Sequence, residues 1–292
     1  MWKRINWRAV LYTFIWLVCL SGLVVLMSFI NVKKDGVRCK DIKVLIPGSD
    51  NLIERSEVDR ILTRSQGQLL GRMVNRINIH RLENDLRNNP FIEDARVYMD
   101  MDGTIQVKVR QRIPVLRVLN VTNQDFYIDK NGLKIPMSQN FTARVLAANG
   151  FILEDFTNRV DTLKTRVARD LFTTASFIEK DSLWSNQIEQ LFVNEKSEIE
   201  MIPRVGNQRI VLGNADSLEN KFRNLLAFYK QAMPKVGWDT YKIINIKYAH
   251  QVVGVKNTAA DSLALKKAAI AHAARVDSMQ QDKQDTVKIL TQ

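Results

Sequence analysis

The sequence predicts an α+β protein in which a single apolar N-terminal helix precedes two folded domains. Three observations lead to this prediction. Residues 10–30 form a long uncharged apolar run without a counterpart elsewhere in the chain. Residues 41–256 alternate short strand patterns with amphipathic helix patterns, which is typical of an α+β fold with a mainly antiparallel sheet. Residues 257–292 are rich in Ala, Lys, Asp and Gln with almost no aromatics, so we expect a mobile tail.

The apolar run Val10–Ile30 is long enough to cross a membrane. As an α-helix its 21 residues would extend about 31 Å, which matches the ~30 Å hydrocarbon core of a bilayer. A cleaved signal peptide is the alternative, but its apolar core has about 7 to 15 residues and ends at small residues. The end of this run, Ser28-Phe29-Ile30, offers no such site. We therefore expect an uncleaved transmembrane signal anchor.

The segments that flank the run set the expected topology. Residues 1–9 would form a cytoplasmic head, and the polar residues 31–40 would form a short tether. Basic residues lie on both sides of the run, so the flanking charges do not decide its orientation. The small head and the large C-terminal body favour export of the body.

Charge and cysteine content limit the classes of partner. A formal charge of +12 with 46% hydrophobic residues indicates a basic globular chain, which could attract nucleic acid, anionic lipid or acidic polymers. The basic residues are scattered among acids without a Lys/Arg tract, so we expect no nucleic-acid partner. The two cysteines, Cys19 and Cys39, cannot build a disulfide framework within the body, which must therefore be held by its core.

The first folded domain is predicted at residues 41–113. An apolar strand at residues 42–46 stops at the turn dipeptide Pro47-Gly48. Ser56 is the expected N-cap of a helix that stops near Gly67. Asn78 is the expected N-cap of a second helix, which Asn89-Pro90 ends.

A hairpin should complete this domain. Alternating apolar residues before and after Asp102-Gly103 predict two antiparallel strands, with both residues of the turn at positive φ. The order is then strand, helix, helix, strand, strand, with the two helices covering one face of the sheet.

The second folded domain is predicted at residues 114–256. Strand patterns occupy residues 115–121, 126–128, 133–135, 145–152, 188–194, 198–202 and 209–212. One helix pattern includes Leu163 to Ile178, and another starts at Asp216 or Ser217 and is closed by Pro234. The last strand is expected at residues 242–256, with an interruption near Ala249-His250.

Several short motifs in this order resemble those of a known family. In the first domain they are Ile42-Lys43-Val44, Ser56-Glu57-Val58, Asn89-Pro90-Phe91-Ile92 and Ala95-Arg96-Val97; in the second they are Tyr127-Ile128-Asp129, Leu212-Gly213 with Leu218, Lys221 and Phe222, and Tyr248. Together with the preceding span, they resemble the bacterial FtsQ/DivIB cell-division family over residues 1–256. Gln111 stands where that family usually has an acid, and residues 147–150 also depart from its pattern.

The resemblance implies a POTRA-type βααββ domain followed by an FtsQ-type β domain. It also implies a divisome scaffold at the septum, held in the inner (plasma) membrane as a single-pass type II protein with its body on the periplasmic side. In this family the last strand of the β domain is an edge to which the small partner FtsB adds a strand, and FtsL joins it. Carried onto this sequence, the edge is Ile246 to Val253, with Tyr248 as an aromatic anchor and Lys196 as a basic contact.

The partner-binding residues implied in this way are Ile246, Lys247, Tyr248, His250, Gln251, Val253 and Lys196. Two alternatives remain open at this stage. Tyr248 could be an inward-facing core residue of an alternating strand, and Lys196 could be an ordinary surface lysine.

Catalysis finds little support in the sequence. The three histidines, His80, His250 and His272, have no carboxylate or second histidine at the spacing of metal ligands, and the usual hydrolase and metalloprotease motifs do not occur. We therefore expect no enzyme, metal or cofactor. Two other function classes stay open: a POTRA-bearing export or outer-membrane assembly component, and an ectodomain that binds anionic polymer or lipid.

Overall fold

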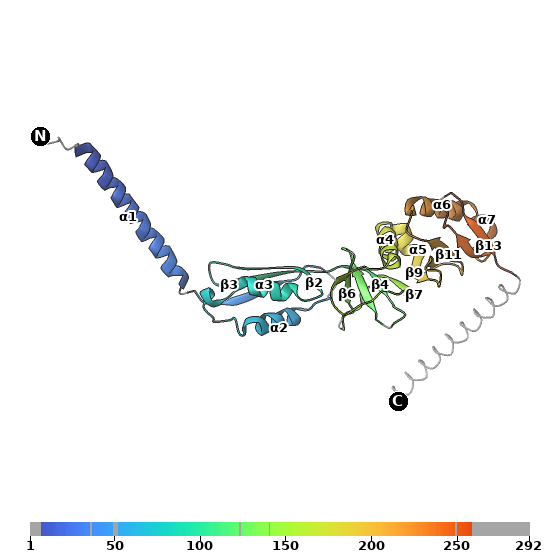
Figure 1. The fold of residues 1–292 in the computed structure, drawn as a ribbon, viewed down its shortest axis with the longest axis horizontal. Helices are drawn as coiled ribbons and strands as arrows, with labels where there is room; N and C mark the ends of the chain where they lie inside the picture. The colour runs from blue at the N-terminus through green and yellow to red at the C-terminus, as the bar shows by residue number, and fades with distance from the viewer. Residues whose placement is uncertain are drawn as a thin grey trace, which may run out of the picture. The chain divides into compact units, whose positions relative to one another are not determined.

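The computed structural model describes residues 7–35, 37–48, 52–122, 124–139, 141–248 and 250–258 (Figure 1). It divides into two compact units. The first precedes Pro114 and also takes in Ser138–Ala143, and the second contains the remainder from Pro114 onward. The α+β prediction is confirmed. The predicted head before Trp7 and the predicted tail beyond Thr258 lie outside the described residues.

The first described element is helix α1, Trp7–Asp35. Its described side chains, those of Trp7 and residues 11–27, are exposed. Over the residues that the structure describes, no helix meets the length and apolarity needed to span a membrane. The expected tether differs from the structure, because α1 continues through Asp35 and the chain joins the first unit directly afterwards. Lys33 and Lys34 are good helix formers, and the first glycine after the apolar run is Gly36.

The first unit is a three-stranded sheet with two α-helices. Its elements are β1 Asp41–Leu45, α2 Arg55–Gln66, the 3-10 helix η1 Val74–Arg76, α3 Ile79–Arg87, β2 Ile92–Met99 and β3 Thr104–Gln111. The sheet order is β1-β3-β2, with β1 parallel and β2 antiparallel to β3. Apolar residues of α2 and α3 such as Val58, Leu62, Leu82 and Leu86 share one core with the strands. The predicted order of elements is confirmed.

The helix caps of this unit follow the prediction in part. The Asn78 side chain caps α3 by accepting a hydrogen bond from the Arg81 amide at 3.0 Å, and Gly67, with φ of 76°, ends α2. The predicted Ser56 cap is wrong, because Glu54 is the N-cap residue and Ser56 lies in the first turn. The Ser56 hydroxyl instead donates to the Glu54 carboxylate at 3.3 Å.

The hairpin lies where it was predicted, but its turn is of another type. Positive φ occurs at Gly103, with 91°, and not at Asp102. The Gly103 amide donates to the Asp100 carbonyl, and the Asp102 carboxylate accepts from the Thr104 amide at 3.0 Å. The side chain of Asp102 therefore stabilises a longer turn, which does not require this residue to adopt the left-handed conformation.

The second unit is built on a ten-stranded sheet with the order β13-β12-β11-β10-β9-β7-β4-β5-β6-β8. Its strands are β4 Pro114–Val118, β5 Phe126–Asp129, β6 Leu133–Pro136, β7 Leu146–Gly150, β8 Asp161–Thr162, β9 Ile188–Val193, β10 Ile199–Pro203, β11 Arg209–Gly213, β12 Tyr241–Asn245 and β13 Val253–Lys256. The pairs β4/β7, β7/β9 and β11/β12 are parallel, and the other neighbouring pairs are antiparallel. The prediction of a mainly antiparallel sheet is confirmed.

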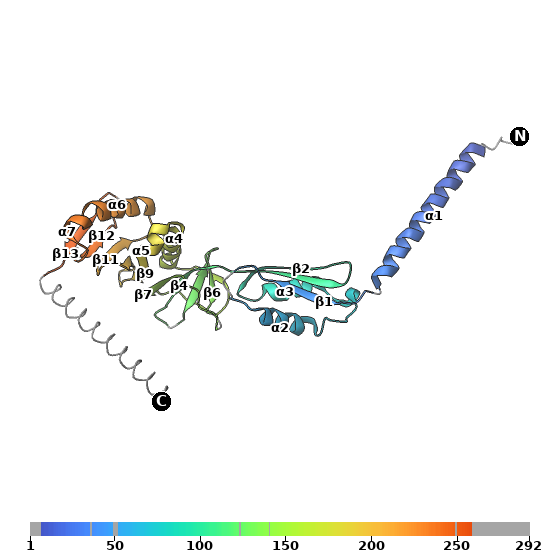
Figure 2. The same ribbon diagram turned by 180° about the vertical axis from the view of Figure 1, so that it is seen from behind.

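Within the described part of this unit, four helices accompany the sheet: α4 Arg166–Lys180, α5 Ser182–Gln187, α6 Leu218–Gln231 and α7 Met233–Val236. Both views show α6 and α7 beside β11 to β13 (Figures 1 and 2). The Phe222 ring links three of the helices, since its centroid lies 4.8 Å from that of Phe177 and 5.0 Å from that of Trp184. These aromatic contacts hold α4, α5 and α6 together on the core.

Three predicted boundaries in this unit change. Leu163 precedes α4, and Pro234 lies in the first turn of α7 instead of ending α6. Proline is tolerated there because the first amides of a helix have no partner within it. The last predicted strand is in fact two antiparallel strands, β12 and β13, joined by residues 246–252, of which Ala249 lies outside the described residues.

Candidate functional site

The described sheet of the second unit ends at β13, which pairs with β12. All four β13 residues are exposed, including the apolar side chains of Val253 and Val255, which are 44% and 47% accessible. In an antiparallel pair, alternate residues direct their N–H and C=O groups away from the partner strand. β13 therefore presents backbone donors and acceptors together with two apolar side chains along one open edge.

Contacts with residues 239–241 hold this edge strand in place. The amide of Asn257 donates to the Thr240 carbonyl at 2.9 Å, and its side chain donates to the Asp239 carbonyl at 2.6 Å. A Cβ atom on Gly254 would come within 2.5 Å of the Tyr241 ring, so the absence of a side chain lets that ring lie against the strand. The Tyr241 ring in turn packs edge-on against Phe228 of α6 at 5.3 Å. The Tyr241 ring thus connects β13 to helix α6.

The predicted edge, Ile246 to Val253, requires correction. Val253 is its only member in β13, because the chain leaves the ladder after Asn245. The Asn245 side chain accepts from the Lys247 amide at 2.9 Å and so supports this departure. Ile246 is fully buried, and its amide donates to the Val211 carbonyl at 2.9 Å, so it cannot contact a partner directly.

The remaining predicted residues lie in the exposed connection between the two strands. Tyr248, His250 and Gln251 are all exposed, and the Tyr248 side chain is 52% accessible. The alternative in which Tyr248 faces the core is therefore wrong. Whether these residues bind a partner stays a prediction.

Lys247 connects this loop to the start of β10. Its ammonium forms an ion pair with Glu198, and this hydrogen bond lowers the pKa of the Glu198 carboxyl and raises that of Lys247. To reach Glu198, the Lys247 side chain crosses the end of β11 over Gly213, where a Cβ would lie 2.8 Å from its Cγ. Gly213 also has φ of 82°, which favours glycine.

Lys221 fixes the turn that Lys247 crosses. Its ammonium is buried and donates to the carbonyls of Leu212 and Asn214 at 3.1 and 2.9 Å, and to the Asn214 side chain at 3.0 Å. Burial lowers the pKa of Lys221. Three carbonyl-type oxygens thus satisfy a buried cation and hold the backbone around Gly213.

Lys196 belongs to the same region of the surface. It lies in the turn between β9 and β10, and its charge contributes to lowering the pKa of Glu198. The structure therefore brings together Lys196, Glu198, Lys247 and Tyr248, which we call the charged cluster. An open groove of about 560 Å³ adjoins it, lined by Lys196 and Glu198 together with the half-exposed apolar side chains of Val121 and Phe151.

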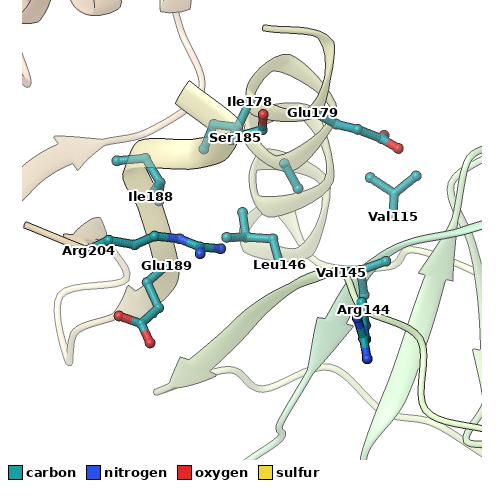
Figure 3. Close-up of a pocket in the computed structure, with 11 residues that line it drawn as sticks. Val115, Arg144, Val145, Leu146, Ile178, Glu179, Ser185, Ile188, Glu189 and Arg204 are labelled. Atoms are coloured by element: carbon teal, nitrogen blue, oxygen red, sulfur yellow. The ribbon is translucent and has the colours of Figure 1, made fainter. Parts of the chain in front are cut away.

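A second pocket of about 330 Å³ lies beside α4, α5 and β9 (Figure 3). Its apolar lining includes Leu146, Ile178 and Ile188, and the Arg204 side chain extends towards Leu146. The Ser185 hydroxyl donates to the Ser182 carbonyl at 3.3 Å, and neither histidine nor cysteine lines the pocket. These groups do not form a nucleophile activated by a base.

Sequence reasoning did not identify two features of this surface. It did not foresee Glu198 as the partner of Lys247, since 49 residues separate them, and it placed the edge of the last strand at Ile246–Val253 instead of at β13. The alternating stretch Val253-Gly254-Val255-Lys256 was the available signal for that strand. Within the described ranges, the structure contains no group of three or more His, Cys, Asp or Glu residues that could hold a metal ion.

The βααββ unit and the ten-stranded sheet with an open edge define a POTRA-bearing protein with a surface suited to binding extended peptides. Comparison with known proteins agrees with this class. A model of the POTRA-like domain matches residues 37–110, and a model described as FtsQ/DivIB, C-terminal related, matches residues 113–255. The chain belongs to the FtsQ/DivIB family.

Three curated relatives have names from this family. The chain is 22% identical over 175 residues to cell division protein DivIB of Clostridium acetobutylicum, which covers 59% of this chain and 64% of the relative. It is 24% identical over 170 residues to cell division protein FtsQ of Rhodothermus marinus, covering 56% and 60%, and 27% identical over 92 residues to FtsQ of Rickettsia bellii, covering 32% of each. The matched segments thus span less than two thirds of each relative.

Proposed function

We propose that this protein is a non-catalytic scaffold of the cell-division machinery that recruits single-span partners of the FtsB and FtsL type by strand addition at β13. The observation that carries the proposal is the open edge of the sheet. The four residues of β13 are exposed there, and the strand pairs with β12 on its other side. Family membership and the names of the relatives support a role in division, and favour it over the export or assembly alternative.

The chemistry of this edge suits an extended peptide. Outward N–H and C=O groups of β13 would pair with the backbone of an added strand, which gives affinity without dependence on sequence. Val253 and Val255 would contact alternate side chains of that strand. Tyr248 adds a large half-exposed ring just beyond the end of the ladder, and such rings commonly dominate binding energies at interfaces.

The charged cluster would supply specificity. Glu198 neutralises Lys247 and leaves Lys196 as the unpaired basic side chain of the cluster, in a groove wall that also contains Glu195. We therefore expect an acidic residue in the partner segment that approaches this surface. Complementary charges of this kind increase the association rate more than the final affinity.

We also propose that Val10–Ile30 anchors the chain in the inner membrane, with the folded units on the periplasmic side at the septum. The support is the length of the uncharged run and the exposure of the described α1 side chains. An anchor would concentrate the scaffold near single-span partners and raise their effective concentration. Extraction of membranes with alkaline carbonate tests this point, because release of the full chain into the soluble fraction would contradict it.

The central experiment replaces Tyr248 with glutamate in the full chain and measures co-purification with the FtsB and FtsL equivalents of its own cell. We expect binding to fall at least tenfold, because a charge would replace the aromatic anchor. Tyr98→Glu is a matched control, since Tyr98 of β2 is also a tyrosine that is 52% accessible. Retained binding by a folded Tyr248→Glu variant, or an equal loss in Tyr98→Glu, would contradict the model.

A further inference from the structure

The chain that leaves α1 is joined directly to one loop of the first unit. The Cys39 amide donates to the Arg72 carbonyl at 2.9 Å, and the Gly71 amide donates back to the Cys39 carbonyl at 2.8 Å. Arg38 forms a β-bridge with Met73, and the Val74 amide donates to the Val37 carbonyl at 3.0 Å. These contacts hold the loop at residues 69–76 against residues 37–39, which follow the end of α1.

Three arginines line an open depression of about 470 Å³ on this loop, together with Gln68, Leu70 and Met73. We call Arg38, Arg72 and Arg76 with these neighbours the arginine surface. Among the described residues, no acidic side chain lines it. Leu70 is 49% accessible, so an apolar side chain lies exposed among the cations.

Backbone oxygens orient two of these guanidinium groups without neutralising them. Arg38 Nη1 donates to the Gly71 carbonyl at 3.0 Å, and Arg72 Nη1 donates to the Gln66 carbonyl at 2.6 Å. Each group keeps its full charge and further N–H donors. Planar guanidinium groups match the geometry of phosphate oxygens and can bind them with two parallel hydrogen bonds.

The position of this surface along the chain selects the source of phosphate. If the anchor ends at Ile30, the helix to Asp35 adds about 7.5 Å and the three residues to Arg38 add at most about 10 Å. Arg38 then lies within about 18 Å of the hydrocarbon boundary. The headgroup layer occupies about 5 to 8 Å of that distance, and an extended arginine side chain spans much of the remainder.

We propose that the arginine surface binds the phosphate headgroups of anionic lipids in the leaflet next to the anchor, and so holds the first unit close to the membrane. The inference rests on the proposed membrane anchor. Lipid is favoured over free phosphate because the anchor keeps headgroups within reach at all times, and because Leu70 and Met73 offer apolar contacts to a membrane surface.

The test uses the full chain in vesicles of phosphatidylcholine alone and of phosphatidylcholine with 30% phosphatidylglycerol. Hydrogen exchange is measured at the amides of residues 69–76. Each arginine near an anionic surface contributes about a fivefold change in binding, so we expect exchange to slow at least fivefold in the anionic vesicles. The protection should decrease at high salt.

The triple variant Arg38→Gln, Arg72→Gln and Arg76→Gln should exchange at the same rate in both kinds of vesicle. The matched control makes the same charge change in the second unit, with Arg144→Gln, Arg159→Gln and Arg204→Gln, and should retain the protection. If the triple variant fails to fold, which exchange in β2 would reveal, the single variant Arg76→Gln replaces it. Among the described contacts, the Arg76 side chain makes no hydrogen bond, so its loss removes charge alone.

The outcomes separate this inference from the anchor on which it rests. Failure of the full chain to float with either kind of vesicle contradicts the anchor. Flotation with equal exchange of residues 69–76 in both kinds of vesicle overturns the lipid site while leaving the anchor intact. If 10 mM inorganic phosphate in pure phosphatidylcholine vesicles protected residues 69–76 as much as the anionic vesicles do, free phosphate and not lipid would be the bound anion.

Discussion

The buried ion pair between Lys134 and Glu154 offers a quantitative test of how the second unit is held together. Lys134 Nζ lies 2.7 Å from Glu154 Oε1, and both side chains are 0% accessible. The same carboxylate accepts from the amides of Lys164 and Thr165 at 2.9 and 2.8 Å. Thr165 is the N-cap residue of α4, so the pair links β6 to the start of that helix.

Replacement of Lys134 with methionine preserves much of the volume and leaves a buried carboxylate without its cation. Breaking such a pair from one side costs about 3–5 kcal/mol of the free energy of unfolding. The double variant Lys134→Met with Glu154→Gln removes both charges and keeps an oxygen for one of the two amides. It should recover more than half of the loss.

The pH dependence of this loss follows from the pKa of Glu154. Burial raises this pKa, but hydrogen bonds from Lys134 and from residues 164 and 165 outweigh burial and lower it below the ordinary value. In the wild type the contribution of Glu154 is therefore present above the unfolded pKa of about 4.3 and is lost as pH falls below it. Without Lys134, burial is opposed less and the pKa rises. The deficit of the variant should then shrink by up to about 1.4 kcal/mol per pH unit between pH 7 and pH 5.

Urea unfolding, monitored by hydrogen exchange at the amides of β5 and β6, measures these free energies of unfolding in the full chain. Lys164→Met is a matched control, because Lys164 pairs with Asp161 at 3.0 Å and is 60% accessible, so the same substitution there should change little. A Lys134→Met variant that is no less stable than Lys164→Met would refute the reasoning. So would a deficit that is the same at pH 5 and pH 7.

Two further predictions concern the proposed binding surface. Gly213→Val should displace Lys247 from Glu198 and raise the Glu198 pKa towards its ordinary value in a carbon-13 NMR titration. Gly237→Val imposes the same strain at φ of 84° with nothing within 4 Å, and should leave that pKa unchanged; equal shifts in both variants would rule out displacement of Lys247 as the cause. Gly254→Val should push the Tyr241 ring off β13 and weaken partner capture, and the added change Tyr241→Ala should restore part of it by relieving the clash. Undiminished capture by Gly254→Val would show that the position of the ring does not matter.

Local signals in the sequence predicted most elements of the first unit. Asn78 could be identified as a cap because its side chain satisfies an amide three residues away, and Asp102-Gly103 located the hairpin because glycine suits positive φ. The type of turn was not predictable, since it depends on the hydrogen bond from the Thr104 amide to Asp102. A cap or a turn that depends on neighbouring residues can therefore be located from the sequence. The choice between two turn types at the same place is harder to predict.

At the edge of the second sheet, the alternation of apolar residues does not predict where strand β12 ends. Alternation continues from Lys242 through Ile246 and Tyr248, so it favours a strand that continues up to the expected interruption near Ala249-His250. The connection at residues 246–252 contains neither Gly nor Pro to signal a turn at Ile246. The reversal depends instead on the Asn245 side chain and on the hydrogen bond from Ile246 to β11. Tertiary contacts of this kind, like the pairing of Lys134 with Glu154, leave no local trace.

The corrected edge makes the strand and the charged cluster parts of one surface. Val253 begins β13 opposite Asn245, so a strand added along β13 would meet the connection at residues 246–252 at that end of the ladder. Lys247 leaves this connection, crosses Gly213 and pairs with Glu198, which lines the groove beside Lys196. A partner segment that continues past the ladder would therefore encounter Tyr248 first and then the charged side chains of the cluster. Backbone pairing at β13 would set the dissociation rate of such a partner, because these hydrogen bonds are lost only when the added strand separates. The exposed charges act before contact, so they would set the association rate.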